Sequence, residues 1–230
     1  MPPFSPEEIA ALRVSLVVGA RAIVFALPLA ILAAYALARG RFWGRALLDA
    51  LVHAPLVLPP VVVGYGLLLI FGIQGPVGAW LDRSFGLRLA FTSAGASLAA
   101  GVCAFPLMVR AVRLSLEAVD EGLDVAASSL GAGPFDRAFS VILPLAAPGI
   151  LSAAVVGFAA CLGEFGAVIT FAANVPGVTQ TLPLAVYSAL QAPGGEAMAA
   201  RLAGVSLILA LGGLFSADYL ARAARRWVGR

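Results

Sequence analysis

The sequence predicts an all-α, polytopic membrane protein with about five transmembrane helices, folded as a single domain over residues 1–230. Of the 230 residues, 61% are hydrophobic and 12% are charged, whereas a soluble domain carries about 25% charged residues. Apolar runs of about 20 residues recur, and each is long enough to cross about 30 Å of hydrocarbon. The arginines gather at the ends of these runs, where membrane topology uses them.

The apolar runs define five expected spans and one shorter helix. The predicted spans are Val14–Leu37, Ala50–Phe71, Phe91–Val109, Ala147–Ala173 and Leu202–Leu220. The apolar segment Leu182–Leu190 is too short to cross a bilayer, so we expect a re-entrant or outer-leaflet helix, with a sixth span as the alternative. Such a segment lies at membrane depth only where protein or a water-filled cavity covers its backbone.

The arginine positions predict the orientation of the chain. All fifteen basic residues are arginines. Ten follow the first, third and fifth spans: Arg39, Arg41, Arg45, Arg110, Arg113, Arg137, Arg222, Arg225, Arg226 and Arg230. Four lie on the other side: Arg13, Arg83, Arg88 and Arg201. Because positively charged loops stay in the cytoplasm, we expect the amino terminus outside and the carboxyl terminus inside. Their placement at span ends argues against nucleic-acid binding.

The chain lacks the residue patterns of several enzyme classes. Without lysine it has no Walker A motif, so ATP and Mg²⁺ must be handled by a partner. The single histidine, His53, and the separated Cys103 and Cys161 do not form a zinc-binding pattern. The HExxH and GxSxG motifs are absent. We therefore expect no catalytic residue, metal site or bound cofactor in this chain.

The most informative segment is the polar stretch between the third and fourth spans. Asp120 can cap a helix, and Gly131 can end it. The apolar positions of that helix recur at helical spacing: Leu123, Ala126, Ala127 and Leu130. A second short helix is expected to begin at Gly133–Pro134 and to end at Pro144, with Pro148 in the first turn of the next span. An amphipathic helix that only covers the membrane surface is the alternative.

The run Asp124-Val-Ala-Ala-Ser-Ser-Leu-Gly131, followed by Val141-Ile-Leu-Pro144, resembles the EAA motif of binding-protein-dependent ABC importer permeases. The glutamate position of that motif is occupied by Val125, and the acid lies one residue earlier at Asp124. The resemblance implies a MetI-like permease fold with a cytoplasmic coupling loop over 111–146. The residues that it implies for coupling to an ATPase are Asp124, Ala126, Ala127, Leu130, Gly131, Ala132 and Pro144.

Further stretches resemble the molybdate permease family within these importers. They are Gly163-Glu-Phe-Gly-Ala-Val-Ile-Thr-Phe-Ala-Ala-Asn174, Gln180-Thr-Leu-Pro183, Gln191-Ala-Pro-Gly-Gly-Glu196 and His53-Ala-Pro-Leu-Val-Leu-Pro-Pro60. The resemblance implies a homodimeric permease in the bacterial inner membrane, with two ATPase subunits and an external molybdate-binding protein as partners. It also implies that the assembled complex is a molybdate-transporting ATPase.

Two stretches supply candidates for the translocation path or gate. Helix-breaking residues within the second span free backbone groups that could line a path, and Glu164 is an ionisable group within an apolar run. A carboxylate is a poor ligand for a dianion, so a packing or gate role is the preferred interpretation of Glu164. The candidates are Pro59, Pro60, Gly64, Glu164, Gly166 and Thr170.

Two other functions remain open from the sequence. The first is a permease for sulfate, thiosulfate or tungstate. The second is a channel or ion-coupled carrier that needs no ATPase, with the polar loop lying only at the membrane interface.

Overall fold

The computed structural model describes residues 4–40 and 42–228, and the regular elements within them are helical. In chain order they are α1 (Pro6–Arg39), α2 (Arg45–Val57), α3 (Pro60–Phe71), α4 (Pro76–Phe85), α5 (Ser93–Glu117), α6 (Glu121–Ser129), α7 (Pro134–Arg137), the π-helical turn η1 (Ala138–Ile142), α8 (Leu143–Gly163), α9 (Gly166–Ala172), α10 (Leu182–Gln191) and α11 (Glu196–Val228). Four helices in the described residues are long and apolar enough to cross a membrane, or five spans if the bent pair α2–α3 counts as one. The all-α membrane fold is therefore confirmed.

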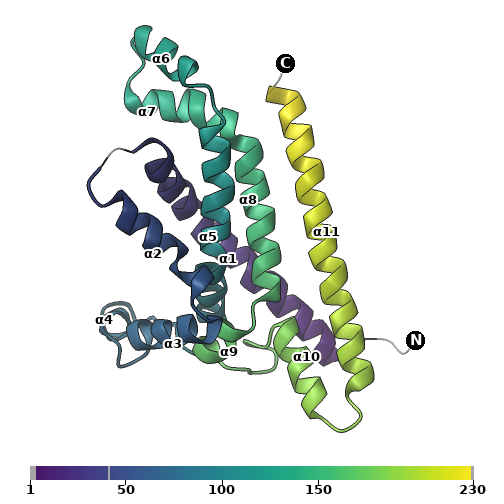
Figure 1. The fold of residues 1–230 in the computed structure, drawn as a ribbon. Coiled ribbons are helices and arrows are strands. Elements are labelled where there is room, and N and C mark those ends of the chain that lie inside the picture. Colours follow the sequence, from purple (N-terminus) through teal and green to yellow (C-terminus); the bar gives the residue numbers. More distant parts are fainter. Residues whose placement is uncertain (1–3, 41, 229–230) are drawn as a thin grey trace.

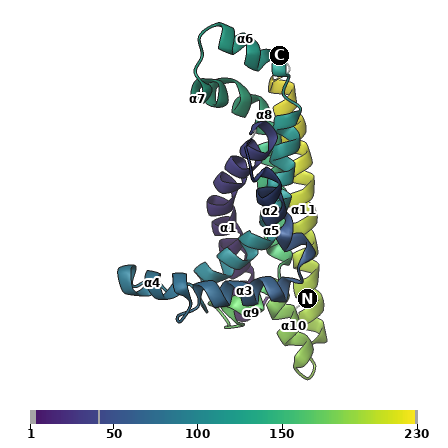
Figure 2. The same ribbon diagram turned by 60° about the vertical axis from the view of Figure 1, so that its left-hand side comes forward.

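The long helices run between two ends of the molecule that carry different short elements. Helices α6 and α7 lie at the end where α11 finishes, whereas α3, α4, α9 and α10 lie at the opposite end (Figure 1). Figure 2 shows α3 and α4 running across the long helices rather than along them. The coupling-loop residues and the gate candidates around α9 thus occupy opposite ends of the molecule.

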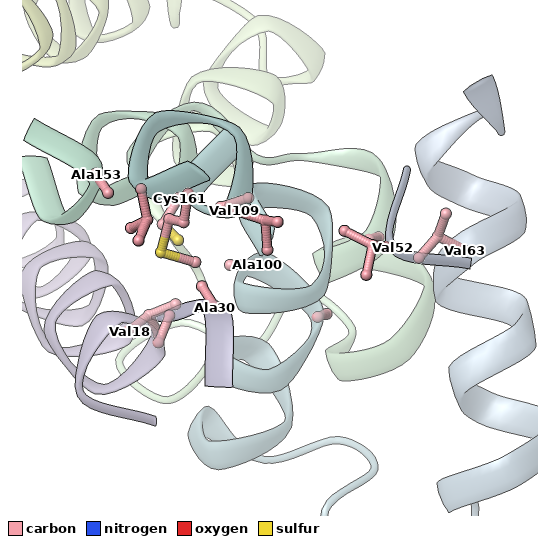
Figure 3. Packing of buried hydrophobic residues seen from close by; sticks show 14 of the residues in the cluster. Val18, Ala30, Val52, Val63, Ala100, Val109, Ala153 and Cys161 are labelled. Carbon is pink, nitrogen blue, oxygen red and sulfur yellow. The ribbon is translucent and has the colours of Figure 1, made fainter. Parts of the chain in front are cut away.

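Small side chains form the core where α1, α5 and α8 pack together. Figure 3 shows Val18 and Ala30 of α1 near Ala100 of α5 and Cys161 of α8. Alanine and glycine let the helix backbones approach closely, which matters in lipid, where apolar burial gives helices no drive to associate. The core therefore holds the two helices that flank the coupling loop, α5 and α8, against each other and against α1.

The second predicted span is two helices. Helices α2 and α3 are bent by 119° at a break between them, which confirms the break that the sequence predicts within the span Ala50–Phe71. Pro59 precedes α3 and Pro60 is its first residue. Neither has an N–H to donate, and a proline disfavours helical backbone in the residue before it. Leu58 accordingly takes an extended conformation, with φ −77° and ψ 141°.

The fourth predicted span is also interrupted. Helix α8 ends at Gly163, and α9 is a separate seven-residue helix, so the continuous span predicted over Ala147–Ala173 is wrong. The backbone of Glu164 is extended, with φ −73° and ψ 126°, although the surrounding run is uniformly apolar. The short helix predicted at Leu182–Leu190 is confirmed as α10.

Two prolines expected at helix boundaries lie inside a helix. The prediction that Pro144 ends the helix from Gly133–Pro134 is wrong, because the chain is helical without interruption from Pro134 to Gly163. Pro148 lies within α8 as well, beyond its first turn. A proline ring clashes with the carbonyl four residues earlier in an ordinary α-helix. The wider π turn η1 lies directly before Pro144 and relieves that clash.

The coupling segment is shorter than the sequence predicts. Helix α5 continues to Glu117, about two turns beyond the predicted end of the third span at Val109. The residues between the two long helical stems are 118–133, within the loop expected over 111–146.

Candidate functional site

Helix α6 is an exposed apolar helix at the end of the molecule where α11 finishes (Figure 1). Its amino terminus is capped as predicted, because the Asp120 carboxylate accepts a hydrogen bond from the Gly122 amide at 2.7 Å. No residue of α6 is buried. Leu123 is 46% exposed, Val125 64% and the adjoining Leu130 89%. Apolar side chains gathered on a projecting helix mark a surface that contacts another protein or the membrane.

The carboxyl end of α6 is closed by a specific hydrogen-bond pattern. The amide of Gly131 donates to the Ser128 carbonyl, and the amide of Ala132 donates to the Ala127 carbonyl, both at 3.0 Å. These two bonds form a Schellman motif, which needs a left-handed residue after the helix. Gly131 supplies it with φ +88°. The predicted role of Gly131 as the end of this helix is confirmed.

The acid of the motif makes an internal ion pair. Asp124 lies 3.3 Å from the guanidinium of Arg137 in α7, and both side chains are largely shielded from solvent. Asp124 therefore fastens α6 to the stem of α8. In the sequence Arg137 contributes only to the predicted topology, because no local pattern shows that it pairs with Asp124 on another helix.

The predicted coupling residues separate into two groups. Asp124, Ala126, Ala127, Leu130, Gly131 and Ala132 lie together in α6 and the turn after it. Pro144 instead lies in the first turn of α8, beyond η1. It belongs to the stem that carries the loop and not to the loop itself.

Arg39, at the end of α1, supports the loop at its other side. Its guanidinium donates to the carbonyls of Leu116 and Val119 at 3.1 Å. These carbonyls lie at the end of α5 and just beyond it, where helical carbonyls have no partner within the helix. Arg39 thus fixes the direction in which the chain leaves α5. The sequence predicts only that Arg39 lies in a group of cytoplasmic arginines after the first span, and it does not predict these two hydrogen bonds.

The gate candidates lie at the opposite end of the molecule, where α8 gives way to α9. The Glu164 carboxylate accepts a hydrogen bond from the Ala167 amide at 2.8 Å. It therefore caps the first turn of α9, whose first amides have no partner within the helix. The same side chain lies near the thiols of Cys103 and Cys161. Glu164 thus points into the helix bundle and stabilises the break between α8 and α9.

Helices α3 and α9 lie against each other (Figure 2). They meet at two glycine positions. A Cβ atom at Gly64 would lie 2.7 Å from the Ala167 carbonyl oxygen and 2.9 Å from the Cβ of Thr170. A Cβ atom at Gly166 would lie 2.9 Å from the Cβ of Pro60. Four residues predicted for the path or gate therefore meet at one contact, although the two pairs are about a hundred positions apart in the chain. Pro59 lies at the bend that directs α3 toward this contact.

The α3–α9 contact extends to α10 through an aromatic pair. The rings of Phe165 and Tyr187 have centroids 5.4 Å apart, a separation at which aromatic rings attract one another. Helix α9 is thus in contact with both α3 and α10.

Comparison of the sequence with known proteins identifies the family of the chain. Residues 26–226 match the family of binding-protein-dependent transport system inner membrane components. The chain is 51% identical to the molybdenum transport system permease protein ModB of Escherichia coli (strain K12), with 96% of each chain covered. It is 47% identical to ModB of Haemophilus influenzae, with 97% of each covered. The sulfate transport system permease protein CysT of Escherichia coli (strain K12) is 35% identical, over 98% of this chain and 81% of CysT.

Solved structures share the fold at low sequence identity. A bacterial ABC transporter involved in the import of alginate has a TM-score of 0.74 at 18% identity, with 96% of this chain and 80% of that chain covered. The MetNI methionine ABC transporter in an inward-facing conformation has a TM-score of 0.68 at 20% identity, with 94% of each covered. The match of residues 26–226 to the family and the 47–51% identity to two of the relatives above establish that the chain belongs to the family of binding-protein-dependent transport system inner membrane components.

Proposed function

We propose that this chain is the membrane-spanning permease subunit of an ATP-driven importer of molybdate. The observation that carries the proposal is α6, an exposed apolar helix held between the ends of two long helices. A helix that only covered lipid would not need a defined stop at Gly131 and an ion pair to α7. The similarity to two molybdenum permeases over nearly the whole chain supports molybdate as the cargo.

The proposed assembly has two copies of this chain, two ATPase subunits in the cytoplasm and one molybdate-binding protein outside. ATP and Mg²⁺ are bound by the ATPase, since this chain has no lysine for a Walker A motif, and the chain itself has no enzymatic activity. The protein lies in the bacterial inner membrane with its amino terminus outside and its carboxyl terminus in the cytoplasm, as the arginine distribution favours. This orientation places α6 at the cytoplasmic face and α3, α9 and α10 at the outer face.

The coupling step follows from how α6 is attached. Asp124 fastens α6 to the α7–α8 stem, and Arg39 fixes the exit from α5. When ATP binding draws the two ATPase subunits together, a force on α6 is therefore delivered to α5 and α8. Helix α8 ends at the Glu164 break, so its displacement reaches α9 and the contact of α9 with α3. Separation of these short helices would open the path to the outside.

Sulfate is the second candidate cargo, because CysT is similar to this chain over nearly its full length. Its 35% identity is well below the 47% and 51% of the two molybdenum permeases. Molybdate is therefore the favoured cargo.

Uptake into proteoliposomes tests both the mechanism and the cargo. The chain is reconstituted with the ATPase and binding protein encoded beside it, and labelled molybdate is offered with excess sulfate. We expect uptake that requires ATP and resists sulfate. Efficient competition by sulfate would transfer the assignment to a sulfate permease, and uptake by this chain alone without ATP would refute the ABC mechanism.

A further inference from the structure

We propose that an anionic phospholipid of the outer leaflet binds in the cleft between α1, α2 and α5, with its phosphate on Arg21 and Arg13. The proposal rests on the orientation given above and goes beyond the transport function. Its basis is a long apolar cleft that joins a basic pocket at a shared arginine.

The apolar cleft has a volume of about 690 Å³. Its walls include Phe25 and Leu29 of α1, Leu51 and Pro55 of α2, and Leu98 and Phe105 of α5. Phe25 is 72% exposed, Leu29 59% and Leu51 63%, so the cleft opens to the surroundings of the helix bundle. These fractions describe a single chain. Where the second copy leaves the cleft uncovered, acyl chains fill such an apolar cleft without a desolvation cost.

The depth of the cleft matches one leaflet of a bilayer. It begins at Ala94, in the first turn of α5, and reaches Phe105, eleven positions further along that helix. Eleven residues of α-helix rise about 16 Å, and half of a hydrocarbon core is about 15 Å thick. The cleft can therefore hold an acyl chain from the headgroup level to the bilayer centre.

The mouth of the cleft carries positive charge without a compensating acid. Arg21 lines the cleft and also a second pocket of about 520 Å³, which Arg13 and Ser93 line too. The Arg21 guanidinium donates to the Ser93 hydroxyl at 3.0 Å. That bond leaves most of its donors available. No aspartate or glutamate lines either pocket, and within the described part of the chain neither arginine has an ion pair.

A basic pocket joined to a long apolar cleft fits a phospholipid better than it fits the transported oxyanion. Two guanidiniums bind a phosphate group well, and Ser93 lies in the first turn of α5, where the helix dipole favours an anion. A small oxyanion would use the basic pocket but would leave the adjoining cleft unfilled. An anionic phospholipid occupies both parts at once.

The test measures lipid retention by the assembled transporter with native mass spectrometry. The complex is delipidated in detergent and then given phosphatidylglycerol or phosphatidylcholine with the same acyl chains. Each guanidinium near an anionic headgroup contributes about five-fold in affinity, so we expect a preference for phosphatidylglycerol of about 25-fold. The variant Arg13→Gln/Arg21→Gln should lose that preference, and the matched control Arg83→Gln, on α4, should keep it.

A second variant tests the apolar part of the site. Ala94 is exposed at the mouth of the cleft, so Ala94→Trp can block the entrance without disturbing the core. We expect it to lose retention of phosphatidylglycerol while the complex stays assembled. Unchanged retention in Ala94→Trp, or equal retention of both lipids by the unaltered complex, would overturn the proposal.

Two further measurements separate the lipid from other occupants. Ala94→Cys should form no crosslink between the two permease copies, because a crosslink would show that protein covers the cleft. In phosphatidylcholine liposomes, Arg21→Gln should leave the KM for molybdate unchanged, and a raised KM would assign the arginine to the cargo instead. Lipid retention is measured without transport, so its outcome does not depend on whether molybdate is the cargo.

Discussion

Replacing Gly131 with alanine tests whether the defined end of α6 serves coupling. Gly131 has φ +88°, and a Cβ atom there would meet no other atom within 4 Å. The substitution therefore introduces backbone strain without a steric clash. A left-handed conformation costs a residue with a Cβ about 1–2 kcal/mol. That free energy lowers the equilibrium constant for forming the closed helix end by about 5- to 30-fold.

The assay compares two alanine variants of the same loop. Gly133 also has open space around it, but its φ is −69°, so Gly133→Ala introduces no left-handed strain. Alanine is a weaker N-cap than glycine, and the lower entropy of the unfolded chain offsets that loss. We expect Gly131→Ala to weaken binding of the ATPase to the reconstituted permease by up to about 30-fold and to lower the molybdate transported per ATP. Gly133→Ala should behave nearly as the unaltered protein does. Equal behaviour of the two variants would refute a coupling role for the closed end.

Three further substitutions test the outer half of the molecule. Gly64→Ala should lower the free energy of unfolding by about 1–3 kcal/mol and abolish uptake, because its Cβ would lie 2.7 Å from a backbone oxygen of α9. The control Gly66→Ala has open space around it and should leave the melting temperature in a thermal-shift assay unchanged. Glu164→Ala should lower the free energy of unfolding by about 1 kcal/mol, because it removes the cap of α9. Glu164→Gln keeps an acceptor oxygen and should retain both stability and uptake. Arg201→Gln should lower the free energy of unfolding by about 3 kcal/mol, because it leaves the buried carboxylate of Glu8, 2.9 Å away, without its charged partner. A decrease of less than about 1 kcal/mol in a denaturation experiment would contradict this.

Local signals explain which parts of the coupling segment were predictable. Asp120 and Gly131 act on the backbone within a few residues, so the sequence alone locates the helix between them. Pro144 also gives a local signal, but a proline stops a helix only if the preceding turn stays regular. The π turn before it supplies another solution, and nothing in the sequence distinguishes the two.

Long-range geometry explains what the sequence could not predict in the gate region. The mean hydropathy of 147–173 stays that of one apolar run, because the single charged residue Glu164 does not lower it enough to divide the run. The prolines before α3 signal a break, but the bend of 119° depends on where α3 finds a surface to pack against. The sequence singled out Gly64 and Gly166 individually. Only the folded chain shows that each makes room for the other's helix.

The arginines were read from the sequence for topology alone, and the structure gives several of them a second role. Arg39 binds the carbonyls where α5 ends, and Arg137 binds Asp124. Counting charges predicts on which side of a membrane a residue lies. It does not predict which carbonyl or carboxylate the side chain will reach.

The α3–α9 contact has a consequence for how such a permease can change its cargo. At this contact the closest atoms belong to the main chain and to small side chains, so the spacing of the two helices is set by glycine and not by variable side chains. Residues that face the path can therefore be exchanged without altering how far apart the helices stand when closed. In the proposed permease, the spacing of the two helices and the selectivity of the path would then be encoded at separate positions, so that one can change while the other is kept.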